Sequence, residues 1–168
     1  MKDATIREFS EFPDRFEFQG DGWASMKGPN SPTLRAILSA SFQLKGARRF
    51  VEAEGVLRRG LEHYPASPVL TSALAGVLLL QDRVEEAETL AQEALLHDPD
   101  DIRALTVMGN IAFRRRNYPE AIRLFRHALS IEAQPYLHYR LALACKETNA
   151  LEAALTEIST ALTLEPEN

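Results

Sequence analysis

The four histidines and the single cysteine are the residues of this chain best suited to metal binding or nucleophilic chemistry. His63 and His97 lie 34 residues apart, which is not a ligand spacing, and His127 and His138 lack a partner at a zinc-like spacing. Cys145 is accompanied by no histidine motif of a catalytic thiol. We therefore expect no metal, no cofactor and no enzymatic activity, with Cys145 as a small apolar core residue.

The clustered charges also have structural explanations. Glu85 and Glu86 would begin a helix, where negative charge is favourable, and Arg114, Arg115 and Arg116 would end one, where positive charge is favourable. A phosphate site at the three arginines remains the alternative reading. Neither pattern requires catalysis.

Size and composition limit the class of protein. The 168 residues suffice for one domain or one short array, and 45% hydrophobic content suffices for a packed core. The net charge of −5 argues against a nucleic-acid partner. No apolar run is long enough to cross a membrane, and the acidic N-terminus does not resemble a signal peptide. We expect a cytoplasmic protein that does not insert into membranes.

Small residues recur along the chain in steps of 34, 34 and 33 residues. One series is Ala53, Ala87, Ala121 and Ala154. A second series is Gly60, Ala94, Ala128 and Ala161. A third is Ser41, Ala75, Gly109 and Ala142. Such a period predicts a stack of similar supersecondary units, in which small residues allow close helix crossings.

The third unit carries the clearest motif. Its expected first helix contains Leu105, Met108, Gly109 and Ala112, and its second contains Tyr118, Ala121, Phe125 and Ala128. This pattern resembles the tetratricopeptide repeat, a unit of two helices. The resemblance implies an all-α fold, a right-handed α-solenoid of four helix-turn-helix repeats. The aromatic residue with which the family pattern begins is absent from every unit.

The expected array occupies residues 34–168, in units 34–67, 68–101, 102–134 and 135–168. Residues 1–33 form an aromatic-rich N-terminal extension, which we expect to dock on the repeats or to cap the first one. Its aromatic residues are Phe9, Phe12, Phe16, Phe18 and Trp23.

Helix starts and turns are marked in the sequence. Ser31 and Ser67 each precede a proline, which predicts a capping serine followed by proline at the first helical position. Asp100 or Asp101 can cap the third unit. Turns inside the units are expected near Arg48-Arg49, Asp82-Arg83, Arg116-Asn117 and Asn149-Ala150.

In the tetratricopeptide family the first helices line an inner groove, and this implies a set of candidate peptide-binding residues. They are Arg35, Phe42, Lys45, Leu79, Arg103, Asn110, Phe113, Arg114, Tyr136, Tyr139, Arg140 and Lys146. Cations outnumber acids in this set although the chain is acidic overall. The expected ligand is therefore a protein or peptide with apolar anchors and acidic residues. The family's carboxylate-gripping pattern is not matched at Leu38 and Phe42, so chaperone binding is not expected.

The favoured function is a protein-interaction module or scaffold. Two alternatives stay open, a self-assembling scaffold and the regulatory repeat region of a larger enzyme. Self-association is expected through residues 1–33 or through the C-terminal repeat. In that repeat, Leu151, Leu155, Ile158 and Leu162 lie at helical spacing on the side that a fifth unit would cover.

Overall fold

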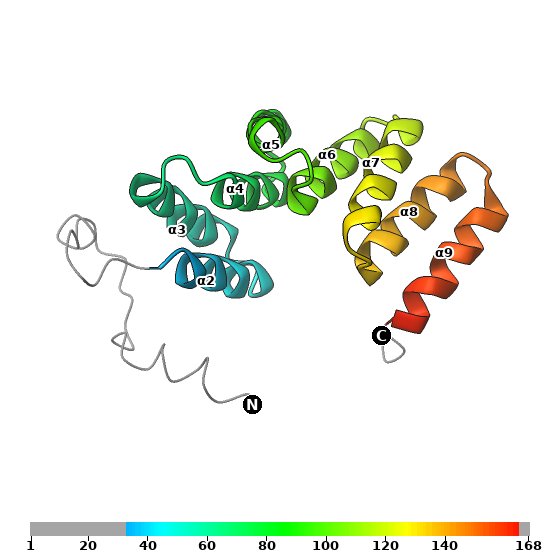
Figure 1. The fold of residues 1–168 in the computed structure, drawn as a ribbon, viewed down its shortest axis with the longest axis horizontal. Coiled ribbons are helices and arrows are strands. Elements are labelled where there is room, and N and C mark those ends of the chain that lie inside the picture. Colours follow the sequence, from blue (N-terminus) through cyan, green and yellow to red (C-terminus); the bar gives the residue numbers. More distant parts are fainter. Residues whose placement is uncertain (1–32, 165–168) are drawn as a thin grey trace. The chain divides into compact units, whose positions relative to one another are not determined.

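The computed structural model describes residues 33–164. This part of the chain is entirely helical, and its eight helices follow one another in pairs along the array (Figure 1). Their bounds are α2 (Leu34–Gly46), α3 (Phe50–His63), α4 (Pro68–Leu80), α5 (Val84–His97), α6 (Ile102–Arg114), α7 (Tyr118–Ile131), α8 (Pro135–Glu147) and α9 (Leu151–Leu164). The expected all-α solenoid is confirmed for this part. The N-terminal extension lies outside the described residues, apart from Thr33.

The first helix of each pair belongs to an inner layer. Each helix packs against its neighbours in the chain, and α4 also packs against α2 and α6, as α6 does against α8. The second helices α3, α5, α7 and α9 make no such contact with one another. The array therefore has an inner side formed by α2, α4, α6 and α8.

Side-chain caps start several of these helices. Ser67 caps α4 by accepting a hydrogen bond from the Leu70 amide, with Pro68 at the first helical position. Asp101 caps α6 by accepting from the Ala104 amide at 3.0 Å. The expectation for the first helix was wrong. Thr33 caps α2 by accepting from the Ala36 amide, so the helix begins after Thr33 rather than at Pro32.

The turns inside the four pairs share one geometry. Arg48, Asp82, Arg116 and Asn149 each have φ near +60°. Around Arg48, its amide bonds the Lys45 carbonyl and the Arg49 amide bonds the Leu44 carbonyl, and the other three turns repeat this pattern. These are the two hydrogen bonds of a Schellman motif, which ends a helix with one left-handed residue.

Small residues fill the helix crossings, as the sequence predicts. All residues of the three small-residue series are buried except Ala161 on α9, which is half-buried. A Cβ atom added to Gly60 would lie 2.8 Å from Ile37 and 3.2 Å from Leu70. A Cβ atom added to Gly109 would lie 2.6 Å from the Phe125 ring. These glycines allow close packing that larger residues would prevent.

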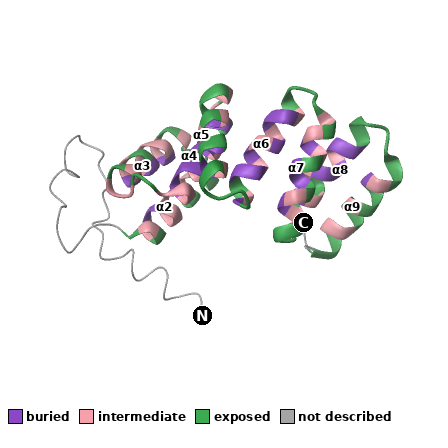
Figure 2. Cartoon of the chain, turned by 45° about the horizontal axis from the view of Figure 1, so that its top comes forward, coloured by how far each residue is buried: buried purple, intermediate pink, exposed green. Residues whose placement is uncertain are grey.

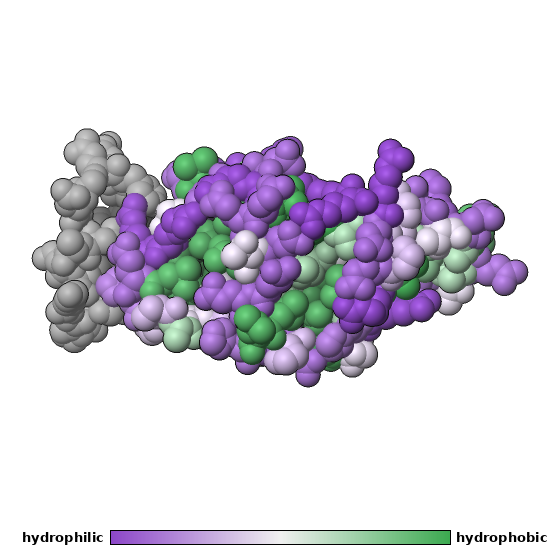
Figure 3. Space-filling view, turned by 90° about the horizontal axis from the view of Figure 1, so that it is seen from above, coloured by the Kyte–Doolittle hydropathy of each residue, from purple (hydrophilic) through white to green (hydrophobic). Residues whose placement is uncertain are grey.

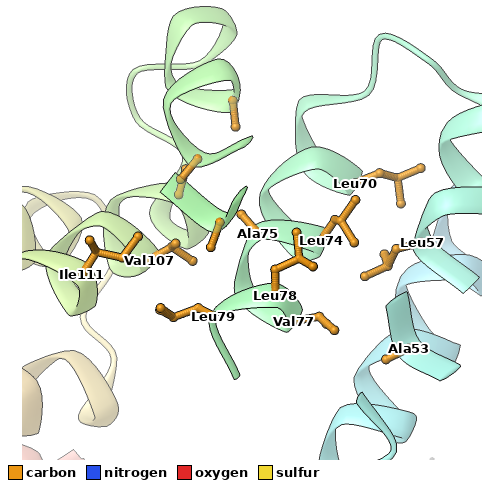
Figure 4. Packing of buried hydrophobic residues seen from close by; sticks show 14 of the residues in the cluster. Ala53, Leu57, Leu70, Leu74, Ala75, Val77, Leu78, Leu79, Val107 and Ile111 are labelled. Atoms are coloured by element: carbon orange, nitrogen blue, oxygen red, sulfur yellow. The ribbon is translucent and has the colours of Figure 1, made fainter. Parts of the chain in front are cut away.

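Helix α4 is buried on most of its surface. Its side chains reach α3 on one side, where Leu70 and Leu74 lie near Leu57, and α6 on the other, where Leu79 lies near Val107 (Figure 4). Ser72 is fully buried as well. Helices α4 and α6 pack directly against each other, so the inner layer is continuous between the second and third units.

Candidate functional site

The structure distributes the twelve candidate residues over three degrees of exposure. The exposed ones are Arg35, Phe42, Lys45, Arg103, Arg114, Tyr136, Tyr139 and Lys146. The half-buried ones are Asn110, Phe113 and Arg140. Leu79 is buried at 6% exposure and belongs to the hydrophobic core, so its side chain offers a peptide little surface.

The three half-buried residues and the exposed Tyr136 form a cluster between α6 and α8, which we call the α6–α8 cluster (Asn110, Phe113, Tyr136 and Arg140). The Asn110 side-chain nitrogen donates to the Tyr136 hydroxyl at 3.3 Å. One helical turn further along both helices, Cζ of Arg140 lies 4.9 Å from the centre of the Phe113 ring. The spacing of three and four residues places these two pairs side by side on the helices.

Arg140 is held against aromatic rings rather than against a carboxylate. Its Cζ also lies 5.9 Å from the centre of the Phe125 ring, which is fully buried on α7. Aromatic faces attract a guanidinium electrostatically. Within residues 33–164 no carboxylate forms an ion pair with Arg140. Phe125 is a site residue that the sequence reasoning missed, since no sequence pattern links it to a residue on the next helix pair.

Two polar atoms of the α6–α8 cluster are buried without a hydrogen-bond partner among the described residues. They are Nε of Arg140, a donor, and Oδ1 of Asn110, an acceptor. They are also the only two side-chain atoms of this kind in residues 33–164. Buried polar groups are nearly always paired in folded proteins, so each atom needs a hydrogen-bonding partner other than residues 33–164, such as a water molecule or a ligand group.

A second group of cations lies toward the N-terminal end of the inner side, and we call it the α2–α6 cluster (Phe42, Lys45 and Arg103). Nζ of Lys45 lies 5.3 Å from the centre of the Phe42 ring. Partial desolvation, followed by the positive charge of Arg103, lowers the pKa of Lys45 below that of a free lysine. The positive charge of Arg103 on α6 therefore reaches Lys45 on α2, and the Phe42 ring beside Lys45 is 69% exposed.

Arg114 is exposed, but it is bound by groups of its own chain. Its Nη1 lies 2.8 Å from a carboxylate oxygen of Asp82, and its Nη2 donates to the Leu79 carbonyl at 3.3 Å. Asp82 lies in the turn of the second unit and neutralises a cation that the sequence suggested as a peptide-binding residue. Leu79 is buried and Arg114 is paired with Asp82, so neither of these two candidate residues is free to bind a peptide as expected.

His127, His138 and Cys145 have structural contacts. Nε2 of His127 lies 2.8 Å from Asp100, and Nδ1 of His138 lies 2.6 Å from Glu157. Cys145 is buried in the core, as expected, and burial raises the pKa of its thiol. Among residues 33–164, no group of three histidine, cysteine or acidic residues could hold a metal ion.

The face seen in Figure 3 is mostly hydrophilic, with apolar areas between the charged side chains. No helix in residues 33–164 is long and apolar enough to cross a membrane. The helix pairs and their inner layer define the class of the protein, an α-solenoid. Such repeat arrays present extended surfaces for binding.

The particular family follows from comparison with known proteins. Two tetratricopeptide repeat models match the chain, one over residues 44–111 and one over residues 102–132. Together they cover residues 44–132, more than half of the 168 residues. The chain belongs to the tetratricopeptide repeat family.

Among curated proteins, the chain is similar to anaphase-promoting complex subunit 7 of human and mouse. The human protein is 33% identical over 98 residues, which cover 57% of this chain and 17% of that protein. The mouse protein is 32% identical over 98 residues, which cover the same fractions of the two chains. The chain thus spans less than a fifth of the length of these relatives.

Solved structures with the same fold include bacterial repeat proteins. The PilF structure from Pseudomonas aeruginosa has a TM-score of 0.69 at 21% identity, covering 80% of this chain and 62% of that one. MamA from Desulfovibrio magneticus RS-1 has a TM-score of 0.61 at 19% identity, covering 80% and 76%. At this level of identity the similarity shows the fold.

Proposed function

We propose that this protein is a non-enzymatic interaction module whose inner side binds a peptide segment of a partner protein. The single observation that carries the proposal is the α6–α8 cluster. It holds a half-buried arginine on two aromatic rings, with one donor and one acceptor buried and unpartnered among the described residues. The chain's membership in the tetratricopeptide repeat family supports the broader proposal of an interaction module, because repeats of this kind serve protein interaction.

The chemistry of the cluster selects the ligand. Leaving a buried donor or acceptor unsatisfied costs about 1–3 kcal/mol, so a ligand that pairs with both atoms gains binding free energy. A peptide offers carbonyl or carboxylate oxygens to Arg140 and an amide N–H to Oδ1 of Asn110. A carboxylate is favoured at Arg140, because a guanidinium binds it in a bidentate, charge-assisted geometry.

The exposed aromatic rings in and next to the two clusters would contact the apolar side chains of the peptide. Tyr136 and Tyr139 on α8 are half exposed, at 50% and 52%, and Phe42 is exposed in the α2–α6 cluster. Large, partly exposed aromatic rings next to arginine are the residues most often responsible for binding energy. We therefore propose a partner segment with acidic residues flanked by apolar ones.

A peptide array tests the proposal. The array carries extended peptides in which aspartate or glutamate stands beside leucine or phenylalanine, together with matched peptides in which each acid is replaced by its amide. The wild-type chain is expected to bind the acidic set better than the amide set. The Arg140→Gln variant is expected to lose at least tenfold in affinity for the acidic set, about 1.4 kcal/mol.

Matched variants make the result specific. Arg126→Gln removes an exposed arginine from α7 and should leave peptide affinity unchanged. Arg140→Lys keeps the charge but loses the planar, bidentate guanidinium, so it should lie between wild type and Arg140→Gln. Thermal melts establish that each variant is folded. Equal binding of acidic and amide peptides by the wild-type chain would contradict the proposal.

A further inference from the structure

The last helix leaves an apolar stripe uncovered. Its members are Leu151, Leu155, Ile158 and Leu162 on α9, with 55%, 65%, 41% and 53% of their surface exposed. Steps of four, three and four residues keep them on one narrow face of the helix. Figure 2 shows α9 largely green and pink, whereas α7 and α8 carry buried faces in purple.

The same face is covered on the other second helices. The positions equivalent to the stripe are Phe50, Glu54, Leu57 and Leu61 on α3, Val84, Glu88, Ala91 and Leu95 on α5, and Tyr118, Ile122, Phe125 and Leu129 on α7. Each of these residues is buried or half-buried, and each of these helices packs against the first helix that follows it. The stripe therefore has the position and the composition of a surface that packs against another helix.

The spacing of the stripe is symmetric. If a second α9 lies antiparallel across the first, with the twofold axis between Thr156 and Glu157, then Leu151 faces the second Leu162 and Leu155 faces the second Ile158. Each large apolar side chain then meets another one. Between the apolar pairs, Glu152 faces the small Ala161 of the second copy, which leaves room for the longer side chain.

The charges favour the same arrangement. The only charged residues of α9 are Glu152 and Glu157, and Glu157 is already paired with His138 of its own chain. In the antiparallel arrangement neither glutamate faces its own counterpart. A parallel arrangement would place each of them opposite an identical glutamate, which is unfavourable. With so little charge, the stripe offers no group that would select a strongly acidic or basic partner.

We propose that the α9 stripe is the contact of a twofold symmetric homodimer of this chain, with the two α9 helices antiparallel. An isologous contact of this kind places the same surface on both copies. One helix face is small compared with the surface that a stable complex buries, so the dimer should form and dissociate readily with concentration.

Sedimentation equilibrium of the full chain over a wide concentration range tests association. The weight-average mass should rise from one chain toward two and no further. Leu155→Glu, next to the proposed axis, should abolish the rise, while Leu96→Glu should not, because Leu96 is 84% exposed on α5 outside the stripe. Circular dichroism before and after heating confirms that both variants are folded. A constant single-chain mass, or a dimer that survives Leu155→Glu, would overturn the proposal.

Disulfide trapping tests the orientation. Leu151→Cys and Leu162→Cys chains should cross-link when mixed under mild oxidation, and neither should cross-link efficiently alone. Cys145 is 1% exposed and should not compete. A disulfide dimer of Leu151→Cys alone, with no mixed product, would show parallel helices and reject the antiparallel contact.

Discussion

Arg83 binds both carboxylate oxygens of Glu54 through a single nitrogen. Its Nη1 lies 2.8 Å from one of these oxygens and 2.9 Å from the other. The same guanidinium binds Glu86 through Nε and Nη2, both at 2.6 Å. Glu54 also accepts hydrogen bonds from Arg58 and Gln81 at 2.8 Å each. Glu54 on α3 is thereby bound to the turn between α4 and α5. These hydrogen bonds join the first helix pair to the second.

Glu54 should make stability depend on acid pH. Desolvation alone would raise its pKa, but hydrogen bonds from Arg58, Gln81 and Arg83 outweigh it and lower the pKa below the ordinary 4.5. A lowered pKa in the folded state adds stability that is complete above the unfolded value and lost as pH falls below it. We expect Glu54→Gln to destabilise the chain by about 1–2 kcal/mol at pH 7 and to weaken its loss of stability as the pH falls below about 4.5.

Urea unfolding at a series of pH values measures this effect. Glu62→Gln is the matched control, because Glu62 is exposed on the same helix and should behave as wild type. Parallel pH curves for wild type and Glu54→Gln would contradict the role given to Glu54.

Glycine 109 should not tolerate even one methyl group. An added Cβ would lie 2.6–3.0 Å from three atoms of the Phe125 ring, which is fully buried and cannot move aside. We expect Gly109→Ala to destabilise the chain by about 1–3 kcal/mol. Gly55→Ala on α3 is the control, because no atom lies within 4 Å of the added Cβ, and it should stabilise by up to about 1 kcal/mol. Thermal unfolding of both variants provides the comparison, and equal effects would refute the packing argument.

Glycine substitutions at the left-handed turn residues should stabilise the chain. Arg116 has φ of 61°, a conformation that costs a residue with a Cβ about 1–2 kcal/mol, most of which glycine avoids. Arg116→Gly should therefore stabilise by about 0.5–1 kcal/mol in chemical denaturation. Asn149→Gly should gain less, since asparagine adopts this conformation more readily. A larger gain at Asn149 than at Arg116 would show that backbone strain is not the cause.

The α2–α6 cluster should contribute to peptide binding independently of Arg140. Arg103→Glu reverses an exposed charge beside Lys45 and should weaken binding of an acidic peptide by about tenfold, or 1.4 kcal/mol. Arg114→Glu is a poorer test, because it would also break the ion pair with Asp82. Fluorescence anisotropy with the best peptide from the array measures the change, and Arg126→Glu serves as the charge-matched control. Equal loss in both variants would indicate a general effect of net charge.

Residues 8–23 are complementary in composition to the inner side, although they lie outside the described residues. They carry five acidic residues against Arg15 alone, together with five aromatic residues. We expect this segment to compete for the inner side, so that removing residues 1–30 raises the affinity for acidic peptides. Unchanged affinity together with unchanged oligomer size would remove both expectations for the extension.

The sequence by itself determined the repeat architecture. The period of the small residues, the capping residues Ser67 and Asp101, and the four turns all reside in local or periodic patterns. Each helix end depends on a few neighbouring residues, and each crossing needs a small residue at a fixed step. The exposed stripe on α9 was predictable for the same reason, because the repeat identifies the side that a further unit would cover.

Only the tertiary structure decided how the inner side is divided. The direct packing of α4 on α6 buries Leu79, and the turn residue Asp82 pairs with Arg114, so neither residue is available to a peptide as the sequence suggested. The tertiary structure also places Arg140 against Phe113 and Phe125, and it leaves Nε of Arg140 without a partner among the described residues. The distances between helices of different units depend on the volumes of all the side chains between them. A repeat period records which residues are equivalent, whereas these contacts join residues that are not.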